Sequence, residues 1–208
     1  MSFAPFGLFL DWELCPDGVE FVPEDVSDPL FRVYRNRSER RRAARWTITN
    51  LEDPVVIRFV NARDEPSRLK FFTRFGMLNN SGATSEESLD KSQRPLRTLL
   101  ERAGSGDVVT ARKAIVTATA RHNLSSVFEI VDVSGGAPRL TMLLAPDGPI
   151  QYMRMEAATV ALHGALYRTC KHCGNAFLTG PLTGRRSHAE YCSDRCRVAA
   201  MRKRNASR

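Results

Sequence analysis

The sequence predicts an α+β protein in which a mixed domain, residues 1–167, is followed by a small cysteine-rich module, residues 168–208. Three observations lead to this prediction. Segments with helical spacing alternate with short segments rich in β-branched and aromatic residues throughout the first part of the chain. Four of the five cysteines fall in the last 39 residues. The formal net charge of +8 is also confined to that end.

The first part of the mixed domain is expected to consist mainly of strands. Between residues 5 and 34, short apolar runs broken by proline and aspartate predict brief strands. Residues 46–51 (WTITNL) and 54–61 (PVVIRFVN) predict two further strands, because both are rich in β-branched and aromatic residues. Residues 64–78 then change to the apolar spacing of a helix.

Helices are expected to dominate the next segment. Thr84 and Glu87 have the spacing of a capping box, so a helix is predicted over about 85–103, interrupted near Pro95. Asp107 is suited to cap a second helix that follows at once.

A hairpin and a last long helix complete the mixed domain. Residues 125–133 and 138–145 predict two paired strands joined by the turn Ser134-Gly135-Gly136. Apolar positions at helical spacing predict the helix over about 149–167. Short strands, helices and a hairpin in one domain indicate the α+β class.

Positive charge is concentrated at the C-terminal end. Residues 1–167 contain 21 basic and 21 acidic residues, so their formal charges cancel. Residues 168–208 contain ten basic residues and only two acids, Glu190 and Asp194. Unbalanced positive charge on a small unit is the electrostatic footprint of a nucleic-acid contact.

A second basic run, residues 35–45, holds six arginines and one glutamate. Because the first 167 residues are balanced overall, we favour a solvated segment that pairs with acids elsewhere over an auxiliary phosphate-contacting patch. We expect Cys15 to be a small buried residue or an idle thiol. Three nearby acids, Asp11, Glu13 and Asp17, are expected to be scattered surface charges rather than a site.

The four C-terminal cysteines have the spacing of a metal site. Cys170 and Cys173 form a C-x2-C pair followed by Gly174, which suits the left-handed turn of a metal-binding knuckle. Cys192 and Cys196 form a C-x3-C pair at a predicted helix start, so that Cys196 lies in the first turn. Knuckle, loop and helix in this order make a treble-clef arrangement. Four thiolates indicate tetrahedral zinc, with iron–sulfur ligation as the competing interpretation.

The predicted zinc is structural, because four cysteines fill the tetrahedral shell and leave no position for water. It would replace the hydrophobic core that so small a unit cannot build. In the helix, Val198 and Met201 are expected to pack inward toward the knuckle. The cations expected to contact nucleic acid are Arg185, Arg186, Arg195, Arg197, Arg202, Lys203 and Arg204. An acidic protein partner, or a basic tail without a partner, are the alternatives.

No catalytic constellation stands out in the sequence. It has no phosphate-binding glycine loop, no H-E-x-x-H and no G-x-S-x-G, and His122 and His163 are isolated. No apolar stretch is long enough to span a membrane, and the N-terminus lacks the basic start of a secretory signal. We therefore expect a cytoplasmic binding protein rather than an enzyme, with no membrane partner.

A family resemblance is carried by residues 59–78, by the hairpin and helix at 125–167, and by the basic end YCSDRCRVAAMRKR. In this layout the chain resembles the bacterial ABATE-domain proteins with a C-terminal CGNR zinc finger. The resemblance is one of architecture. It implies a ligand-sensing or interaction domain joined to a DNA-contacting finger, as in a transcription regulator. DNA is expected over RNA, and the alternative is a protein–protein interaction module in which the finger docks an acidic partner.

Overall fold

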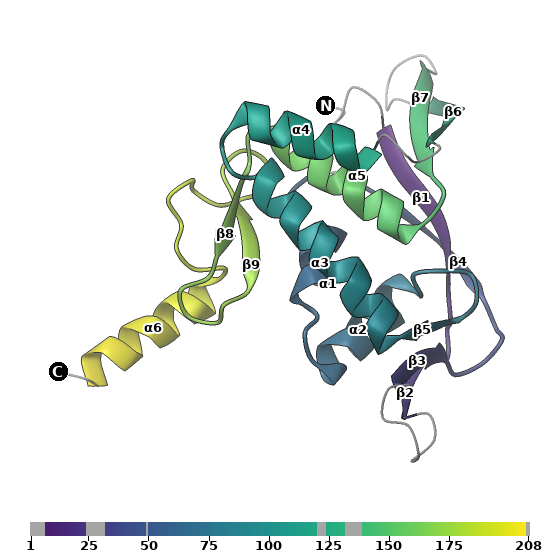
Figure 1. The fold of residues 1–208 in the computed structure, drawn as a ribbon, viewed down its shortest axis with the longest axis horizontal. Helices are drawn as coiled ribbons and strands as arrows, with labels where there is room; N and C mark the ends of the chain where they lie inside the picture. The colour runs from purple at the N-terminus through teal and green to yellow at the C-terminus, as the bar shows by residue number, and fades with distance from the viewer. Residues whose placement is uncertain (1–6, 24–31, 49, 120–123, 132–138, 207–208) are drawn as a thin grey trace.

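The computed structural model describes residues 7–23, 32–48, 50–119, 124–131 and 139–206. Helices and short strands are both abundant among these residues (Figure 1). This mixture confirms the predicted α+β class.

A four-stranded sheet with the order β4-β1-β7-β6 forms one side of the molecule. Its strands are β1 (Gly7–Leu14), β4 (Arg42–Thr47), β6 (Leu124–Val131) and β7 (Arg139–Pro146). β1 pairs antiparallel with β4 and parallel with β7. β6 and β7 form the predicted hairpin, whose expected turn at Ser134-Gly135-Gly136 lies outside the described residues.

Helices pack on this sheet and on one another (Figure 1). They are α1 (Val55–Asn61), α2 (Glu65–Phe75), α3 (Glu86–Ala103), α4 (Val108–Thr119) and α5 (Pro149–Leu162). α5 contacts β1 and β7, and α3 contacts α1, α4 and α5. Leu96 and Leu100 of α3 and Met153 of α5 are completely or almost completely buried in the core between them. Apolar burial of this kind is the main stabilising contribution to the fold.

A smaller antiparallel sheet has the order β2-β3-β5. Its strands are β2 (Val19–Pro23), β3 (Arg32–Asn36) and β5 (Ala83–Ser85). The ring of Tyr34 in β3 is fully buried, with its centroid 4.9 Å from that of Phe21 and 5.2 Å from that of Phe72. Because Phe72 belongs to α2, this aromatic cluster joins the small sheet to the helices.

The C-terminal part of the chain begins with the hairpin β8 (Leu166–Thr169) and β9 (Ala176–Thr179) and ends with α6 (Asp194–Ala206). Ala176 and Leu178 of β9 are buried in the same apolar core as α1 and α5. α6 instead extends away from the remainder of the molecule (Figure 1). The hairpin therefore belongs to the packed body of the protein, and the helix is exposed to solvent.

The strand predicted over residues 54–61 is wrong, because these residues form α1. Five of its seven residues are buried, among them Val55, Val56 and Phe59. β-Branched residues lower helix propensity only slightly, so tertiary packing decides the conformation here.

Both ends of α1 are completed by side chains that are distant in sequence. At its start, the Glu156 carboxyl group of α5 accepts hydrogen bonds from the backbone N–H groups of Val55 (3.1 Å) and Val56 (2.7 Å). At its end, the buried Gln93 amide donates to the carbonyl oxygens of Phe59 (2.7 Å) and Ala62 (2.8 Å). These groups satisfy backbone donors and acceptors that a helix leaves open at its ends.

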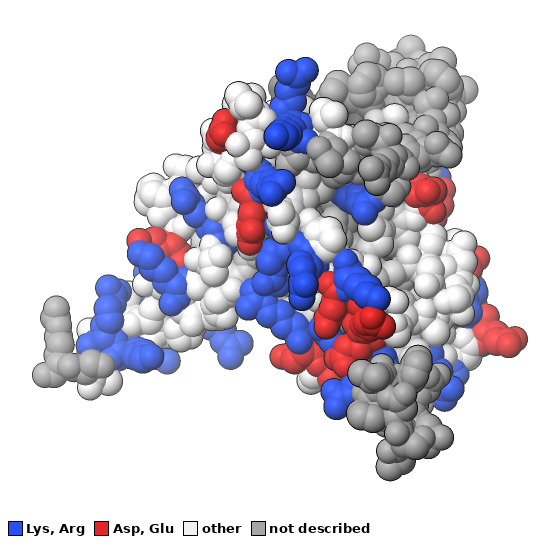
Figure 2. Space-filling view, viewed as in Figure 1, with Lys and Arg blue, Asp and Glu red and all other residues white. Residues whose placement is uncertain are grey.

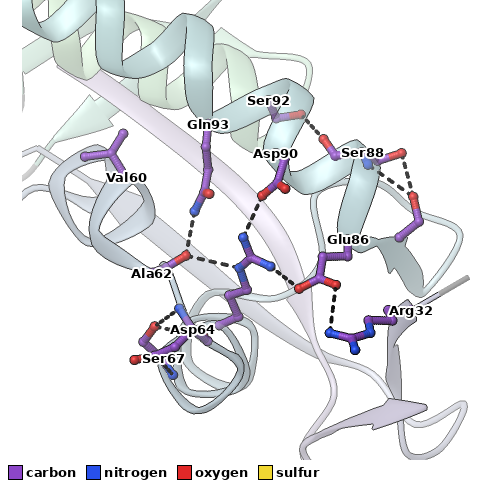
Figure 3. A network of polar contacts seen from close by, with 12 residues as sticks. Arg32, Val60, Ala62, Asp64, Ser67, Glu86, Ser88, Asp90, Ser92 and Gln93 are labelled. Atoms are coloured by element: carbon purple, nitrogen blue, oxygen red, sulfur yellow. Dashed lines mark hydrogen bonds and ion pairs between the residues drawn. The ribbon is translucent and has the colours of Figure 1, made fainter. Parts of the chain in front are cut away.

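A buried arginine fastens α2 to α3 (Figure 3). Arg68 is 6% exposed; its guanidinium pairs with Glu86 and, at 2.6 Å, with Asp90, and it also donates to the carbonyl oxygen of Ala62. Glu86 lies near Arg32 of β3 as well, 3.7 Å away. Buried charges need partners of this kind, because removing them from water is costly.

The helices differ from those expected at three points: the start of α3, its course through Pro95 and the end of α5. The cap of α3 is Ser85, whose Oγ accepts from the Ser88 amide, because Thr84 is held in β5 opposite Tyr34. The helix continues through Pro95 without interruption. α5 ends at Leu162 rather than near 167, since Gly164 adopts a left-handed conformation with φ of 64° and the next residues form β8.

Other local predictions are confirmed. The helix expected within residues 64–78 is α2; Asp64 caps it through the Ser67 amide, and Gly76 follows its last turn. Asp107 accepts a hydrogen bond from the Val109 amide at the start of α4. These boundaries depend on neighbouring residues alone, which is why the sequence indicates them correctly.

Candidate metal centre and basic surface

The four C-terminal cysteines converge on one point. The sulfur atoms of Cys170, Cys173, Cys192 and Cys196, hereafter the cysteine cluster, all lie within 4.8 Å of one another. The Cys192 sulfur is 3.6 Å from that of Cys173 and 3.5 Å from that of Cys196. A tetrahedral ion with sulfur ligands at roughly 2.3 Å would require edges of about 3.8 Å. The cluster is therefore arranged to hold a metal ion, as the spacing predicts.

Local backbone geometry brings the first pair together. The Cys170 amide donates to the carbonyl oxygen of Asn175 (2.9 Å), and the Gly174 amide donates to that of Cys170 (3.0 Å). Gly174 has a φ of 71°, a left-handed conformation that favours glycine. This closed turn is the predicted knuckle, and it points both thiols to one side.

A helix start positions the second pair. Cys192 precedes α6, and Cys196 lies in its first turn. The Ser193 hydroxyl accepts a hydrogen bond from the Cys196 amide at 3.3 Å, which is the geometry of a helix cap. The cap fixes the direction in which α6 leaves the cluster.

The thiols are electrostatically dissimilar. Burial opposes ionisation of Cys170, but backbone hydrogen bonds to its sulfur outweigh burial and lower the pKa of this thiol to about 6. Burial raises the pKa of Cys192, and the adjacent sulfur atoms raise it further. Several thiolates at such short distances repel one another, so a bound cation is what would make the fully ionised cluster favourable.

Contacts with α1 and the segment before it anchor the module to the body. Asn61 donates to the carbonyl oxygen of Ala176 and accepts from its amide, both at 2.8 Å. The Leu51 amide donates to the carbonyl oxygen of Leu182 at 2.9 Å. Sequence reasoning missed these anchors, because the partners are more than 110 residues apart and no local motif marks them.

Arg185, which was predicted to contact nucleic acid, also anchors the module to the body. Its guanidinium donates to the carbonyl oxygens of Glu52 (3.1 Å) and Cys192 (3.3 Å). The side chain thus connects the body to the cysteine cluster. This arrangement leaves fewer of its N–H groups for a phosphate.

The remaining predicted contact residues are all exposed. They are Arg186, Arg195, Arg197, Arg202, Lys203 and Arg204. Arg197 lies 3.2 Å from Asp194, an exposed pair that is weak in water. Blue side chains surround much of the protruding helix in the space-filling view (Figure 2).

The expected inward packing of Val198 and Met201 is wrong. These side chains are 38% and 44% exposed, and α6 has no buried residue. The first turn of α6 is held at the cysteine cluster, and farther along Met201 lines only an open hollow with Tyr191 and His172. α6 therefore presents apolar and cationic groups together to the solvent.

The arginines of residues 35–45 follow the favoured interpretation, in which acids elsewhere balance them. Arg35 pairs with Glu20, Arg40 with Asp17, Arg41 with Glu13 and Arg45 with Asp11. The hydrogen bonds donated by Arg45 lower the pKa of Asp11. The acids near Cys15 are thus partners of this basic run.

The isolated cysteine and histidines do not form a second metal site among the described residues. Cys15 is 5% exposed, and its sulfur lies 3.6 Å from the Ser38 hydroxyl. His163 is the residue that follows α5, and His122 lies outside the described residues. His172 and His188 are exposed and are not part of the cysteine cluster.

Comparison of this chain with protein-family models and with curated proteins finds no match. None of the described helices combines the length and apolarity needed to cross a membrane.

Proposed function

We propose that the protein binds nucleic acid, duplex DNA foremost, through the basic surface of its C-terminal module, and that zinc maintains this surface. The observation that supports the proposal is α6. This helix of 13 residues buries no side chain and begins at the cysteine cluster. A helix with no buried side chain leaves most of its surface free to contact a partner, and an α-helix fits the DNA major groove.

Zinc is the ion that suits the cluster best. A tetrahedral set of four thiolates favours zinc, or iron in an iron–sulfur site, over oxygen-seeking cations. Since the protein supplies all four ligands, the ion would have a structural role. It would connect the knuckle to the first turn of α6 and so fix the orientation of the basic helix.

The charge distribution supports a regulator rather than an enzyme. The mixed domain is neutral overall, and the module carries the entire net charge of +8. Together with the architectural resemblance to ABATE-domain proteins, this division fits a bacterial, cytoplasmic transcription regulator. The mixed domain would sense a ligand or mediate assembly, and the module would contact DNA phosphates.

One observation favours a second candidate function. Val198 and Met201 are exposed on α6 between the cations. A helix that presents apolar and basic groups together also suits an acidic protein with an apolar groove. In that case the module would dock a protein.

A comparison of four proteins tests the proposal by fluorescence anisotropy on a random duplex. Replacing Arg202, Lys203 and Arg204 with Gln should weaken binding roughly ten-fold or more, because three phosphate contacts are lost. Cys192→Ser should weaken it as well and should lose stoichiometric zinc. The matched control replaces Arg102, Arg112 and Lys113, which lie on α3 and α4 away from α6, and should retain the wild-type affinity (Figure 1).

Three outcomes would contradict the proposal or one of its parts. Wild-type protein that binds no duplex, but captures a polyglutamate peptide through the same three cations, would favour the protein-docking function. Equal losses of duplex affinity in the α6 variant and in the control variant would show that binding depends on net charge and not on the position of the cations. Full zinc content in Cys192→Ser would refute the ligand assignment.

A further inference from the structure

An open groove lies between α1 and α2, next to the cysteine knuckle. Its volume is about 350 Å³, and its lining includes Asn175, two residues after Cys173. α1 contacts both α2 and β9, so the groove lies where the mixed domain meets the C-terminal module (Figure 1). A ligand in it would touch both parts of the chain.

Three cations line this groove and only one acid does. Arg58 belongs to α1, and Lys70 and Arg74 are one turn apart on α2. Asp53, the acid, pairs with Arg58. Among the described residues, neither Lys70 nor Arg74 takes part in a salt bridge. The groove is thus left with two positive charges that no described acid neutralises.

Apolar surroundings strengthen the field of these cations. Phe71 and Phe75 line the same groove, and the Arg74 guanidinium lies 5.2 Å from the centre of the Phe75 ring. Charges beside an apolar wall are screened less than charges surrounded by water. An anion with several acceptor oxygens would neutralise Lys70 and Arg74.

We propose that this groove binds a phosphate group, and that in the protein's complex with nucleic acid it holds a backbone phosphate next to those bound by the module. The inference rests on the proposed function. Guanidinium groups and an ammonium group are the common protein ligands of phosphate, and the half-buried Asn175 adds an amide. The footprint of the nucleic acid therefore extends from α6 across the knuckle to α2.

The variant Lys70→Gln/Arg74→Gln tests the inference in the full-length, zinc-loaded protein. Duplex affinity is measured by fluorescence anisotropy at several salt concentrations. Loss of two phosphate contacts should make the log–log salt slope shallower by about 1.8 and weaken binding roughly ten-fold at low salt. The control Arg102→Gln/Arg112→Gln removes the same charge from α3 and α4 and should leave the slope unchanged. Zinc content and thermal unfolding establish that both variants are folded.

The outcomes separate this inference from the proposed function. If the wild-type protein binds DNA and Lys70→Gln/Arg74→Gln binds it equally well with the same slope, the inference is wrong and the proposed function stands. If the wild-type protein binds no nucleic acid, while adenosine monophosphate or inorganic phosphate raises its melting temperature and not that of the variant, the groove binds free phosphate and the proposed function is wrong. If the wild-type protein binds neither duplex DNA nor adenosine monophosphate nor inorganic phosphate, the inference and the proposed function are both wrong.

Discussion

Glu156 is a buried acid whose surroundings shift its titration toward neutral pH. Burial raises the pKa of its carboxyl group to about 8, although the amides of Val55 and Val56 act in the opposite direction. The ordinary value is 4.5. Between these two values the folded protein binds more protons than the unfolded chain, so the free energy of unfolding falls as pH rises. The stabilisation is complete below pH 4.5 and lost as pH passes about 8.

Replacing Glu156 with Gln should remove this dependence. The amide keeps an oxygen acceptor for α1 but does not titrate. Wild-type stability from urea unfolding should fall between pH 5 and 8 by at most about 1.4 kcal/mol per unit, and the Gln variant should be nearly flat. The control Glu39→Gln changes an exposed acid and should behave as wild type. Wild-type stability that rose with pH over this interval would refute the assignment.

Charge pairing at single arginines favours the interpretation of the basic run at 35–45 as a neutralised segment over a phosphate-contacting patch. Four of its arginines face acids of the N-terminal strands and turns. Exposed pairs of this kind contribute little stability, but they neutralise the local field. Lys70 and Arg74 belong to no comparable basic run in the sequence, yet they line the groove beside the knuckle. Acidic residues that the fold brings close, rather than the number of basic residues in a stretch of sequence, decide which cations are left to bind an anion.

At the level of elements, α1 is the clearest case of a helix imposed by its surroundings. Its sequence, VVIRFVN, has the composition of a strand. A helix of seven residues is also too short to be stable alone. It forms because Glu156 satisfies its first amides and Gln93 its last carbonyl groups. Local composition carries no sign of partners that are 31 to 101 residues away.

Gln93→Leu tests the support at the end of α1. The substitution leaves two buried carbonyl oxygens, those of Phe59 and Ala62, without the amide that now donates to them. Each oxygen keeps a second donor, Ala62 from Arg68 and Phe59 from the Ala62 amide, so the loss is that of two hydrogen bonds. At about 0.5–1.5 kcal/mol each, a decrease of about 1–3 kcal/mol in the free energy of unfolding is expected from urea denaturation. Ser92→Ala, one position earlier in α3, removes an exposed hydroxyl contact and should change stability by less than about 0.5 kcal/mol.

α6 shows the opposite relation between sequence and structure. Its start was predictable, because Ser193 caps it and the cysteine spacing fixes Cys196 in the first turn. Its surroundings were not, because the apolar residues Val198 and Met201 suggest packing that does not occur. Helical spacing indicates which residues share a face, but it does not indicate whether another element lies opposite that face.

At the level of the whole molecule, the neutral mixed domain and the basic module share one apolar core through Ala176 and Leu178. Asn61 and Arg185 add polar contacts across the same boundary. The basic helix is consequently held at one place relative to α1 and α2. In the proposed complex, this fixed position would allow cations from both parts of the chain to contact one nucleic acid.

The features of this architecture that could be predicted are those determined by residues close together in the sequence. The class, the hairpin of β6 and β7, the helix α2, the cap at Asp107 and the cysteine cluster all follow from neighbouring residues. The conformation of α1, the anchoring role of Arg185 and the groove depend on groups that the fold brings together from distant positions. Tertiary contacts override local propensity at those places.

The salt dependence of duplex DNA binding tests the central claim most directly. Six of the seven predicted contact residues remain after Arg185 is assigned to anchoring: Arg186, Arg195, Arg197, Arg202, Lys203 and Arg204. If all six contact phosphates, a plot of log affinity against log salt should have a slope near −5, at about 0.9 per contact. Contacts in the groove would make it steeper. A slope shallower than about −2, or no binding at low salt, would contradict the account.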